Sequence, residues 1–281
     1  MREIACEQIA DTVARLCIEA NYQLPADVSA ALRRALAREE SPLGQDILQQ
    51  VLENEAIARQ GEFPLCQDTG YTTVWLELGQ EVHIAGGDLE QCITEGVRRG
   101  YRDGYLRKSV VARPFPERVN TGDNTPPIVY TRIVPGDRLK VTVMPKGGGG
   151  ENMSQLKMLL PAKGRQGIVD FVVQVVEQAG ANPCPPIIVG VGVGGTAEKA
   201  MLLAKEALLR EVGQPSAHPD DAALEADILE RVNGLGIGPQ GLGGTVTALA
   251  VTVISHPCHF ASLPVGVVIQ CHSSRHKEEV L

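Results

Sequence analysis

The stretch "PPIIVGVGV" at residues 185–193 carries no charged or hydrogen-bonding side chain and leads directly into the helical pattern "GTAEKAMLLAKEALLREV". A short apolar run bounded by turn residues is typical of a buried strand, and Thr196 is a suitable N-cap for the helix that follows. Further strand and helix patterns alternate along the chain without a strict β-α-β rhythm. The sequence therefore predicts an α/β fold, in which helices cover a mixed β-sheet core.

Two regions differ in pattern. Residues 1–60 predict a helical N-terminal segment, because apolar positions recur at three- and four-residue steps in "EIACEQIADTVARLCIEA" and in two later stretches. Those later stretches begin near Pro25 and Pro42, and proline is common at the start of a helix. Residues 61–281 predict the mixed α/β region, which would carry the chemistry.

Within the second region, the pattern changes at residue 71 to the β-rich run "YTTVWLEL", and a helix follows that ends near Gly104. The alternating stretches "IVYTRIV" and "RLKVTVM", joined by "PGD", predict a β-hairpin over residues 128–144. We expect two helical segments after it, near residues 153–161 and 164–179.

Composition excludes several classes of function. The net charge of −8 argues against broad nucleic-acid binding, which needs a basic surface, and the aromatic content of 4% disfavours base stacking. The sequence contains no run of 18 apolar residues, so it predicts no membrane span. The N-terminus has no basic-then-apolar signal pattern, so a cytoplasmic location is expected.

The number and positions of the cysteines limit the roles that their thiols can have. Their odd number, seven, in a chain without an export signal argues against a disulfide framework and leaves free thiols, a metal site, or both. Three of them lie at the edges of predicted strands, where thiolates could converge on an iron–sulfur cluster or zinc. Isolated cysteines are also common as small buried apolar residues, so both interpretations stay open. The three are Cys66, Cys184 and Cys271, while Cys6, Cys17 and Cys92 lie in predicted helices and are expected to pack.

Two glycine clusters have functional and structural interpretations. The run "PKGGGGEN" at residues 145–152 could bind an anion through backbone N–H groups, or it could be a flexible connection. Gly190, Gly192 and Gly195 satisfy the G-x-G-x-x-G pattern of an NAD(P)-binding oxidoreductase. The acidic residue expected at the end of a second strand is absent, since only Glu211 lies near that position, on a predicted helix. The dinucleotide interpretation therefore ranks second.

Eight short motifs from residue 66 to residue 276 carry a specific resemblance. They are "CQDTG", "LRKSVV", "NTGDNTP", "PKGGGGENMS", "NPCPP", "GVGVGGT", "GIGPQGLGG" and "ASLPVGVVIQCHSSRH". In this order they resemble the alpha subunit of class I fumarate hydratase, to which the L(+)-tartrate dehydratase alpha subunit is similar.

The resemblance implies an oxygen-sensitive [4Fe–4S] cluster with three cysteine ligands, at the matching positions Cys66, Cys184 and Cys271. The fourth iron would lack a protein ligand and would bind substrate, so that it could act as a Lewis acid on a departing hydroxyl. Cys258, in "SHPCHF", is the rival for the third ligand.

The same resemblance implies a substrate pocket for a dicarboxylate, with matching positions at Gln67, Asp68, Arg107, Gly149 and His259. Asp68 is the best candidate for proton transfer in this chain. Three of these positions have a structural alternative: Asp68 as a turn residue with an Asx-type bond, Arg107 as a solvated cation at a helix end, and His259 as a structural histidine.

The implied activity is the reversible hydration of fumarate to L-malate, with L(+)-tartrate or a methyl-substituted fumarate as alternative substrates. The resemblance also implies a separate beta subunit that completes the active site, in an α2β2 assembly. A non-catalytic, metal-binding scaffold is the remaining alternative from another class.

Overall fold

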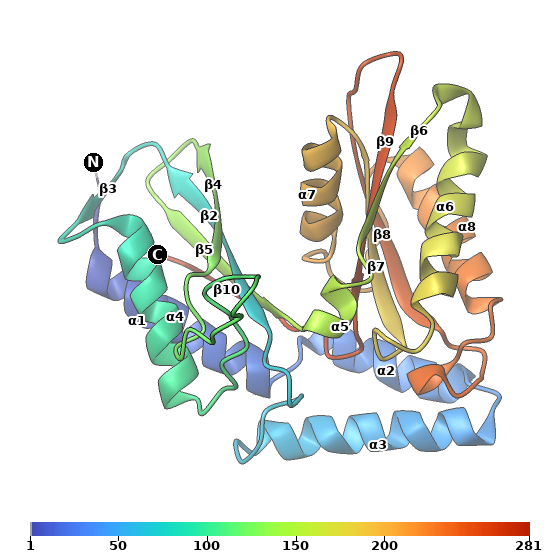
Figure 1. Cartoon of the computed structure of the whole chain (residues 1–281), viewed down its shortest axis with the longest axis horizontal. Helices are drawn as coiled ribbons and strands as arrows, with labels where there is room; N and C mark the ends of the chain where they lie inside the picture. Colours follow the sequence, from blue (N-terminus) through green and yellow to red (C-terminus); the bar gives the residue numbers. More distant parts are fainter. Residues whose placement is uncertain (1) are drawn as a thin grey trace. The chain divides into compact units, whose positions relative to one another are not determined.

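A computed structural model describes residues 2–281, and it divides the chain into two compact units (Figure 1). Unit 1 consists of Met1–Pro25, Glu55–Gly148 and Arg275–Leu281, and unit 2 consists of Ala26–Asn54 and Gly149–Ser274. The predicted helical segment at the N-terminus is helical as expected, but its residues are shared between the two units. Among the described residues, no helix has the length and apolar character needed to cross a membrane.

Unit 1 is a four-stranded sheet with two long helices and a small two-stranded sheet. Its elements are β1 (Arg2–Ala5), α1 (Cys6–Tyr22), β2 (Tyr71–Gly79), β3 (Val82–Ala85), α4 (Leu89–Asp103), β4 (Ile128–Val134), β5 (Leu139–Lys146) and β10 (Lys277–Val280).

The four-stranded sheet of unit 1 has the order β10-β5-β2-β4. The predicted hairpin of β4 and β5 is therefore wrong, because β2 lies between them, parallel to β4 and antiparallel to β5. Val74 of β2 stands opposite Val129 on one side and Val143 on the other. The alternating pattern and the turn are local signals, and they do not record which strand lies beside which. The buried, apolar β2 is inserted between β4 and β5, so these two strands do not pair with each other.

Helices α1 and α4 pack against each other and on the sheet of unit 1 (Figure 1). Gly96 and Gly100 allow their close approach, because a Cβ at these positions would lie 2.6 Å from the carbonyl oxygen of Ala10 and 2.8 Å from that of Ala14. Cys17 lies in this core as a small apolar side chain, as predicted, and its burial raises the pKa of its thiol to about 12.

Unit 2 is built around a second four-stranded sheet. The elements that complete the chain are α2 (Ala26–Arg38), α3 (Pro42–Arg59, which runs on into unit 1), α5 (Gly148–Glu151), β6 (Gln155–Leu159), the 3₁₀ turn η1 (Pro161–Lys163), α6 (Gly164–Ala179), β7 (Ile187–Gly194), α7 (Ala197–Ala207), α8 (Pro219–Asn233), the 3₁₀ turn η2 (Pro239–Gly241), β8 (Ala248–His256) and β9 (Leu263–Gln270).

The sheet of unit 2 has the order β6-β9-β7-β8, in which β7 and β8 are parallel and the other pairs antiparallel. Helix α7 lies on one face, and α6 and α8 lie on the other (Figure 1). The helix predicted at residues 153–161 is wrong, because this segment forms the edge strand β6. Its pairing with β9 and the burial of Leu159 in the core outweigh its local preference for helix.

The glycines of the G-x-G-x-x-G pattern have a structural explanation. Gly190 and Gly192 lie within β7, facing α7, and a Cβ on either would come within about 2 Å of the carbonyl oxygens of Ala204 and Ala200. They are strand residues that allow α7 to pack closely, and they do not form a loop after the strand, as a phosphate-binding fingerprint requires. The structure gives the dinucleotide interpretation no support.

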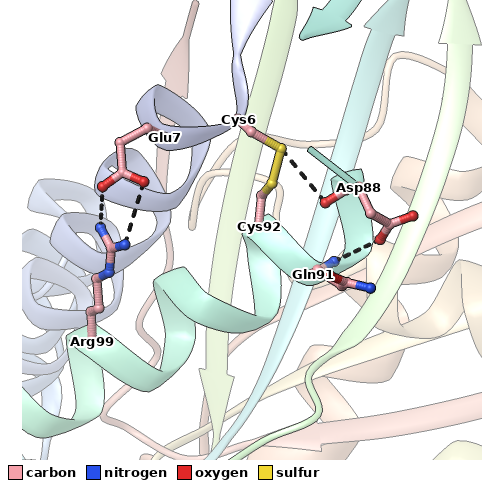
Figure 2. The surroundings of a disulfide bond; sticks show 6 residues. All are labelled: Cys6, Glu7, Asp88, Gln91, Cys92 and Arg99. Carbon is pink, nitrogen blue, oxygen red and sulfur yellow. Dashed lines mark hydrogen bonds and ion pairs between the residues drawn. A yellow bond between two sulfur atoms is a disulfide. The ribbon is translucent and has the colours of Figure 1, made fainter. Parts of the chain in front are cut away.

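A disulfide joins Cys6 and Cys92, so the expectation from the odd number of cysteines, that the thiols are free or bind a metal, is wrong for these two (Figure 2). The bond connects the first residue of α1 to the first turn of α4, where Asp88 caps the helix by accepting from the backbone N–H of Gln91 at 2.9 Å. The sequence offered no signal for it, because the two helices meet only through tertiary packing.

We expect the disulfide to contribute strongly to the stability of unit 1, because the two cysteines are 86 residues apart. In the chain-entropy description, a loop of this length gives about 4 kcal/mol. The double variant Cys6→Ser/Cys92→Ser should melt roughly 10 °C below the oxidised protein in a calorimetric scan. A phosphine reductant should lower the melting temperature of the wild type and leave that of the double variant unchanged. Equal melting temperatures for both proteins would contradict this prediction.

Glu39 connects the end of α2 to the segment before β8. It is 2% exposed, and its carboxylate accepts hydrogen bonds from the backbone N–H groups of Ser41 at 2.9 Å, Thr245 at 2.9 Å and Val246 at 2.8 Å. Burial alone would raise the pKa of this carboxyl, but the backbone donors of Ser41, Thr245 and Val246 lower it below its ordinary value. Ionised Glu39 therefore stabilises unit 2.

The sign of the pH dependence follows from the lowered pKa. The contribution of Glu39 should be present above the pKa of an unfolded glutamate, about 4.3, and should be lost as the pH falls through the lower pKa of the folded state. At pH 7, Glu39→Gln should reduce the free energy of unfolding by about 2 kcal/mol, because charge-assisted hydrogen bonds are replaced by weaker ones. Urea unfolding at pH 7 and pH 3 measures both effects. An equal loss at the two pH values would contradict the assignment.

Candidate functional site

The pentapeptide "CQDTG" forms a tight turn that leads into β2 in unit 1. One carboxylate oxygen of Asp68, Oδ1, accepts from the backbone N–H of Gly70 at 3.0 Å and from the Ser109 hydroxyl at 3.3 Å. The other, Oδ2, accepts from the backbone N–H of Gly148 at 2.8 Å. The bond to Gly70 is the Asx-type turn that the structural alternative predicted. The carboxylate is half-buried and held by three donors, so its orientation is fixed.

Tyr101, on α4, supports the turn from the core of unit 1. Its hydroxyl lies 2.8 Å from the carbonyl oxygen of Thr69 and 3.0 Å from that of Gly70, and it accepts from the Thr72 hydroxyl at 3.1 Å. Burial raises the pKa of Tyr101, which therefore stays a neutral hydrogen-bond donor.

Asn124 supports the turn from a second side. It is fully buried, donates its amide to the carbonyl oxygen of Gly70 at 3.1 Å and accepts from the backbone N–H of Ser109 at 2.7 Å. Its φ of +63° is a conformation that asparagine adopts more easily than most residues.

Burial of the neighbouring Asp123 opposes ionisation, but hydrogen bonds from Thr125 and from an arginine lower its pKa to about 2.

Arg107 lies beside the same turn. Its carbonyl oxygen accepts from the Thr69 hydroxyl at 2.9 Å, and its side chain is exposed. Gln67 is exposed on the other flank of Asp68, and its Oε1 lies 3.4 Å from the Cys66 sulfur. Unit 1 thus brings together four of the predicted site residues: Cys66, Gln67, Asp68 and Arg107.

The glycine run after β5 closes the site on the side of the Asp68 carboxylate. A Cβ on Gly147 would lie 3.1 Å from Oδ2 of Asp68, so glycine gives this carboxylate its space. The predicted anion-binding loop does present a backbone N–H to an anion, but the anion is the chain's own Asp68. In unit 2, a Cβ on Gly149 would lie 2.8 Å from the carbonyl oxygen of Asn182, so Gly149 serves a close backbone contact.

Cys184 and Cys271 lie at the same end of the sheet in unit 2. Cys184 precedes β7 and Cys271 follows β9, and these strands are antiparallel neighbours with Ile188 opposite Gln270. The imidazole Nδ1 of His272 lies 3.0 Å from the carbonyl oxygen of Cys184, which connects the two segments directly. Neither cysteine is in a disulfide, and both thiols are at least partly exposed.

The structure does not bring His259 to this end of the sheet. His259 lies in the loop between β8 and β9, whereas Cys271 follows the far end of β9, roughly 25 Å away for an eight-residue strand. The imidazole accepts from the backbone N–H of Ala261 at 3.2 Å and borders a largely apolar cavity of about 570 Å³ with Phe260 and Leu263. Its assignment to the substrate pocket gains no support from the geometry of this chain.

Cys258 shares the loop of His259, and its thiol donates to the carbonyl oxygen of Ser262 at 3.3 Å. Cys258 therefore lies near the start of β9, whereas Cys271, which lies at the same end of the sheet as Cys184, follows its other end. This placement favours Cys271 over Cys258 as the cysteine that acts together with Cys184.

Three thiols outside disulfides are the predicted cluster ligands, and their chemistry suits a cluster, since thiolates are the usual ligands of iron–sulfur groups. Cys66 belongs to unit 1, and Cys184 and Cys271 belong to unit 2. Within residues 2–281, no three His, Cys, Asp or Glu side chains are gathered in an arrangement ready to hold a metal ion. The cluster therefore stays a prediction.

Sequence reasoning did not identify the residues that support these segments. In unit 1 they are Tyr101, Ser109, Asn124 and Arg275, whose Nη2 donates to the carbonyl oxygen of Asp68 at 2.6 Å. In unit 2 they are His272 and Gln240, whose Nε2 donates to the carbonyl oxygen of Pro185 at 3.0 Å. Four of the motifs that carried the resemblance contain Ser109, Asn124, Gln240, and the pair His272 and Arg275. The signal was therefore present in the motifs, but their composition does not say which residue contacts which.

Comparisons with known proteins identify the family of this chain. The sequence pattern of the family described as fumarate hydratase (Fumerase) matches residues 10–280. The putative L(+)-tartrate dehydratase subunit alpha of Methanocaldococcus jannaschii is 43% identical over 272 residues, which cover 95% of each chain. L(+)-tartrate dehydratase subunit alpha of Escherichia coli strain UTI89 is 32% identical over 278 residues, which cover 98% of this chain and 91% of the relative. The chain therefore belongs to the fumarate hydratase family, as its motifs predicted.

Proposed function

We propose that this chain is the alpha subunit of a hydro-lyase that adds water to, or removes it from, a four-carbon dicarboxylate. The observation that carries the proposal is the Asp68 carboxylate, held by three donors beside the exposed Arg107 and the partly exposed Cys66. Family membership supports the reaction class, and the names of the relatives support a substrate with two carboxylates.

The cofactor we propose is a [4Fe–4S] cluster with Cys66, Cys184 and Cys271 as its ligands. When bound, such a cluster with one iron free of protein ligands supplies a Lewis acid for the departing hydroxyl. The support from this chain is the soft donor set and the contact that joins the segments of Cys184 and Cys271 through His272.

The residues of unit 1 have separable tasks in this proposal. The Arg107 guanidinium binds a substrate carboxylate, for which its planar fork is suited, and the Gln67 amide donates to a carboxylate or hydroxyl. Asp68 takes the proton from the carbon next to the one that loses the hydroxyl. The hydrogen bonds from Gly70 and Gly148 hold the Asp68 carboxylate still, so that little reorganisation is needed during proton transfer.

Two substrates have specific support. L(+)-tartrate is favoured by the names of the relatives at 43% and 32% identity. Fumarate, with L-malate as its product, is favoured by the description of the family. The two reactions differ by one additional hydroxyl on the substrate, so one polar contact could decide between them.

A second subunit belongs to the proposal, because the relatives are named as alpha subunits. We propose that it completes the active site, with an α2β2 assembly as the expected stoichiometry. A cytoplasmic location stays an expectation.

The ligand assignment predicts a defined pattern of iron loss. In chains purified without oxygen, together with the second subunit, Cys66→Ser, Cys184→Ser and Cys271→Ser should each lose most of the bound iron and the broad visible absorbance. Cys258→Ser is the matched control and should retain both, because Cys258 lies at the other end of β9. Iron loss in Cys258→Ser but not in Cys271→Ser would overturn the assignment.

The proposal that Asp68 is the base predicts that its replacement lowers turnover but leaves the cofactor in place. Asp68→Asn should keep its iron and lose about 10²- to 10⁴-fold in kcat, the usual contribution of a general base. The assay should present L(+)-tartrate, fumarate, L-malate and a methyl-substituted fumarate side by side. Near-normal turnover in Asp68→Asn would refute the role of Asp68, and an iron-loaded wild type that converts none of these substrates would favour the non-catalytic metal-binding alternative.

A further inference from the structure

Arg275 is a fully buried arginine with an unusual set of contacts. It is 1% exposed and lies between Cys271 and β10, in unit 1. Its Nη2 donates to the backbone carbonyl oxygen of Asp68 at 2.6 Å. Among the described residues its Nε and Nη1 atoms have no hydrogen-bond partner, and no carboxylate forms an ion pair with it. Its one hydrogen bond therefore goes to the residue that we propose as the base.

Arg210, in unit 2, shows how an arginine is paired with a carboxylate in the same chain, although its Nε, like that of Arg275, has no hydrogen-bond partner among the described residues. Its Nη2 pairs with the carboxylate of Glu225, and its Nη1 donates to the carbonyl oxygen of Val253 at 3.3 Å. Burying a guanidinium is costly, and pairing with a carboxylate normally offsets part of the cost. Arg275 has no such partner, so a purely structural role accounts poorly for a charged residue at its position.

The Arg275 guanidinium also lies on the side of the Asp68 carboxylate that faces the glycine run. A Cβ on Gly147 would lie 3.1 Å from Oδ2 of Asp68 and 3.8 Å from Nη2 of Arg275. The guanidinium therefore holds the Asp68 backbone while its charge lies near the Asp68 carboxylate. Gly70 and Gly148 bind the carboxylate itself, so backbone and side chain are fixed by different partners.

We propose that Arg275 is a positioning residue that fixes Asp68 for proton transfer. The proposal rests on the proposed function of Asp68 and adds to it a residue from a distant part of the chain. Without the Arg275 bond, the Asp68 peptide can rotate, and the carboxylate loses its alignment with the backbone N–H groups of Gly70 and Gly148. A displacement of about 1 Å at a reacting group costs up to roughly 100-fold in rate.

The first test compares Arg275→Gln and Arg275→Lys in the enzyme assembled with its second subunit. We expect kcat to fall about 10- to 100-fold in Arg275→Gln, with KM changed less than about twofold and iron content unchanged. Arg275→Lys keeps the charge and one donor and should restore part of kcat. Arg210→Gln is the matched control: it should lower the melting temperature and leave kcat unchanged. Wild-type kcat in a folded Arg275→Gln variant would overturn the proposal.

A double-mutant cycle separates positioning from general damage to the fold. If Arg275 acts through Asp68, the kcat loss caused by Arg275→Gln should vanish in an Asp68→Asn background. The loss of melting temperature should persist, because the backbone carbonyl at position 68 remains. Full additivity of the two kcat losses would show that Arg275 acts independently of Asp68 and would overturn the proposal.

Hydrogen exchange tests the geometry without any assay of activity. In Arg275→Gln and Arg275→Lys, peptides that contain Gly70 and Gly148 should exchange faster than in the wild type, whereas peptides from α6 should not change. Unchanged exchange at both glycines would overturn the role of Arg275, whichever variant folds. Faster exchange in a protein that converts none of the substrates would support the hold of Arg275 on Asp68 and overturn the proposed function alone.

Discussion

The hydrogen bonds of Asp68 organise unit 1 because they join segments that are far apart in the sequence. Its carboxylate binds the backbone of Gly148, 80 residues further on, and its carbonyl oxygen binds Arg275, 207 residues further on. One such hydrogen bond alone would offset only a small part of the conformational entropy that is lost when its segment becomes ordered. Together they hold the turn before β2 against the end of β5 and the start of β10, which are the strands that complete the sheet.

The parts of the fold that the sequence predicted well are those with strong local signals. Helix α4 has a capping aspartate, a clear apolar stripe and an end beside Gly104, and β7 is uniformly apolar. The two errors, the hairpin of β4 and β5 and the helix in place of β6, concern which strand pairs with which. Pairing depends on contacts between distant segments, and neither alternation nor propensity records those.

For the site, the sequence proposed chemistry-bearing side chains but not the residues that support them. Cys66 was a candidate because thiolates are metal ligands, whereas Asp68 and Arg107 were proposed only through the resemblance of their motifs to the family. Asn124 and Tyr101 contribute ordinary hydrogen bonds, and nothing in their type distinguishes them from other polar core residues. The Cys6–Cys92 disulfide was missed for a related reason, since two helical cysteines far apart in sequence become partners only when α1 packs on α4.

The interleaving of the two units has a consequence for the order in which the protein assembles during synthesis. All residues of unit 2 precede residue 275, whereas unit 1 needs β10 and Arg275, which are made later. The ribosome therefore delivers the complete sequence of unit 2 first, with the thiols of Cys184 and Cys271 in it, although unit 1 supplies the N-terminal helix. Until β10 emerges, the edge of β5 that pairs with it remains open, and an open strand edge of this kind can pair with another chain.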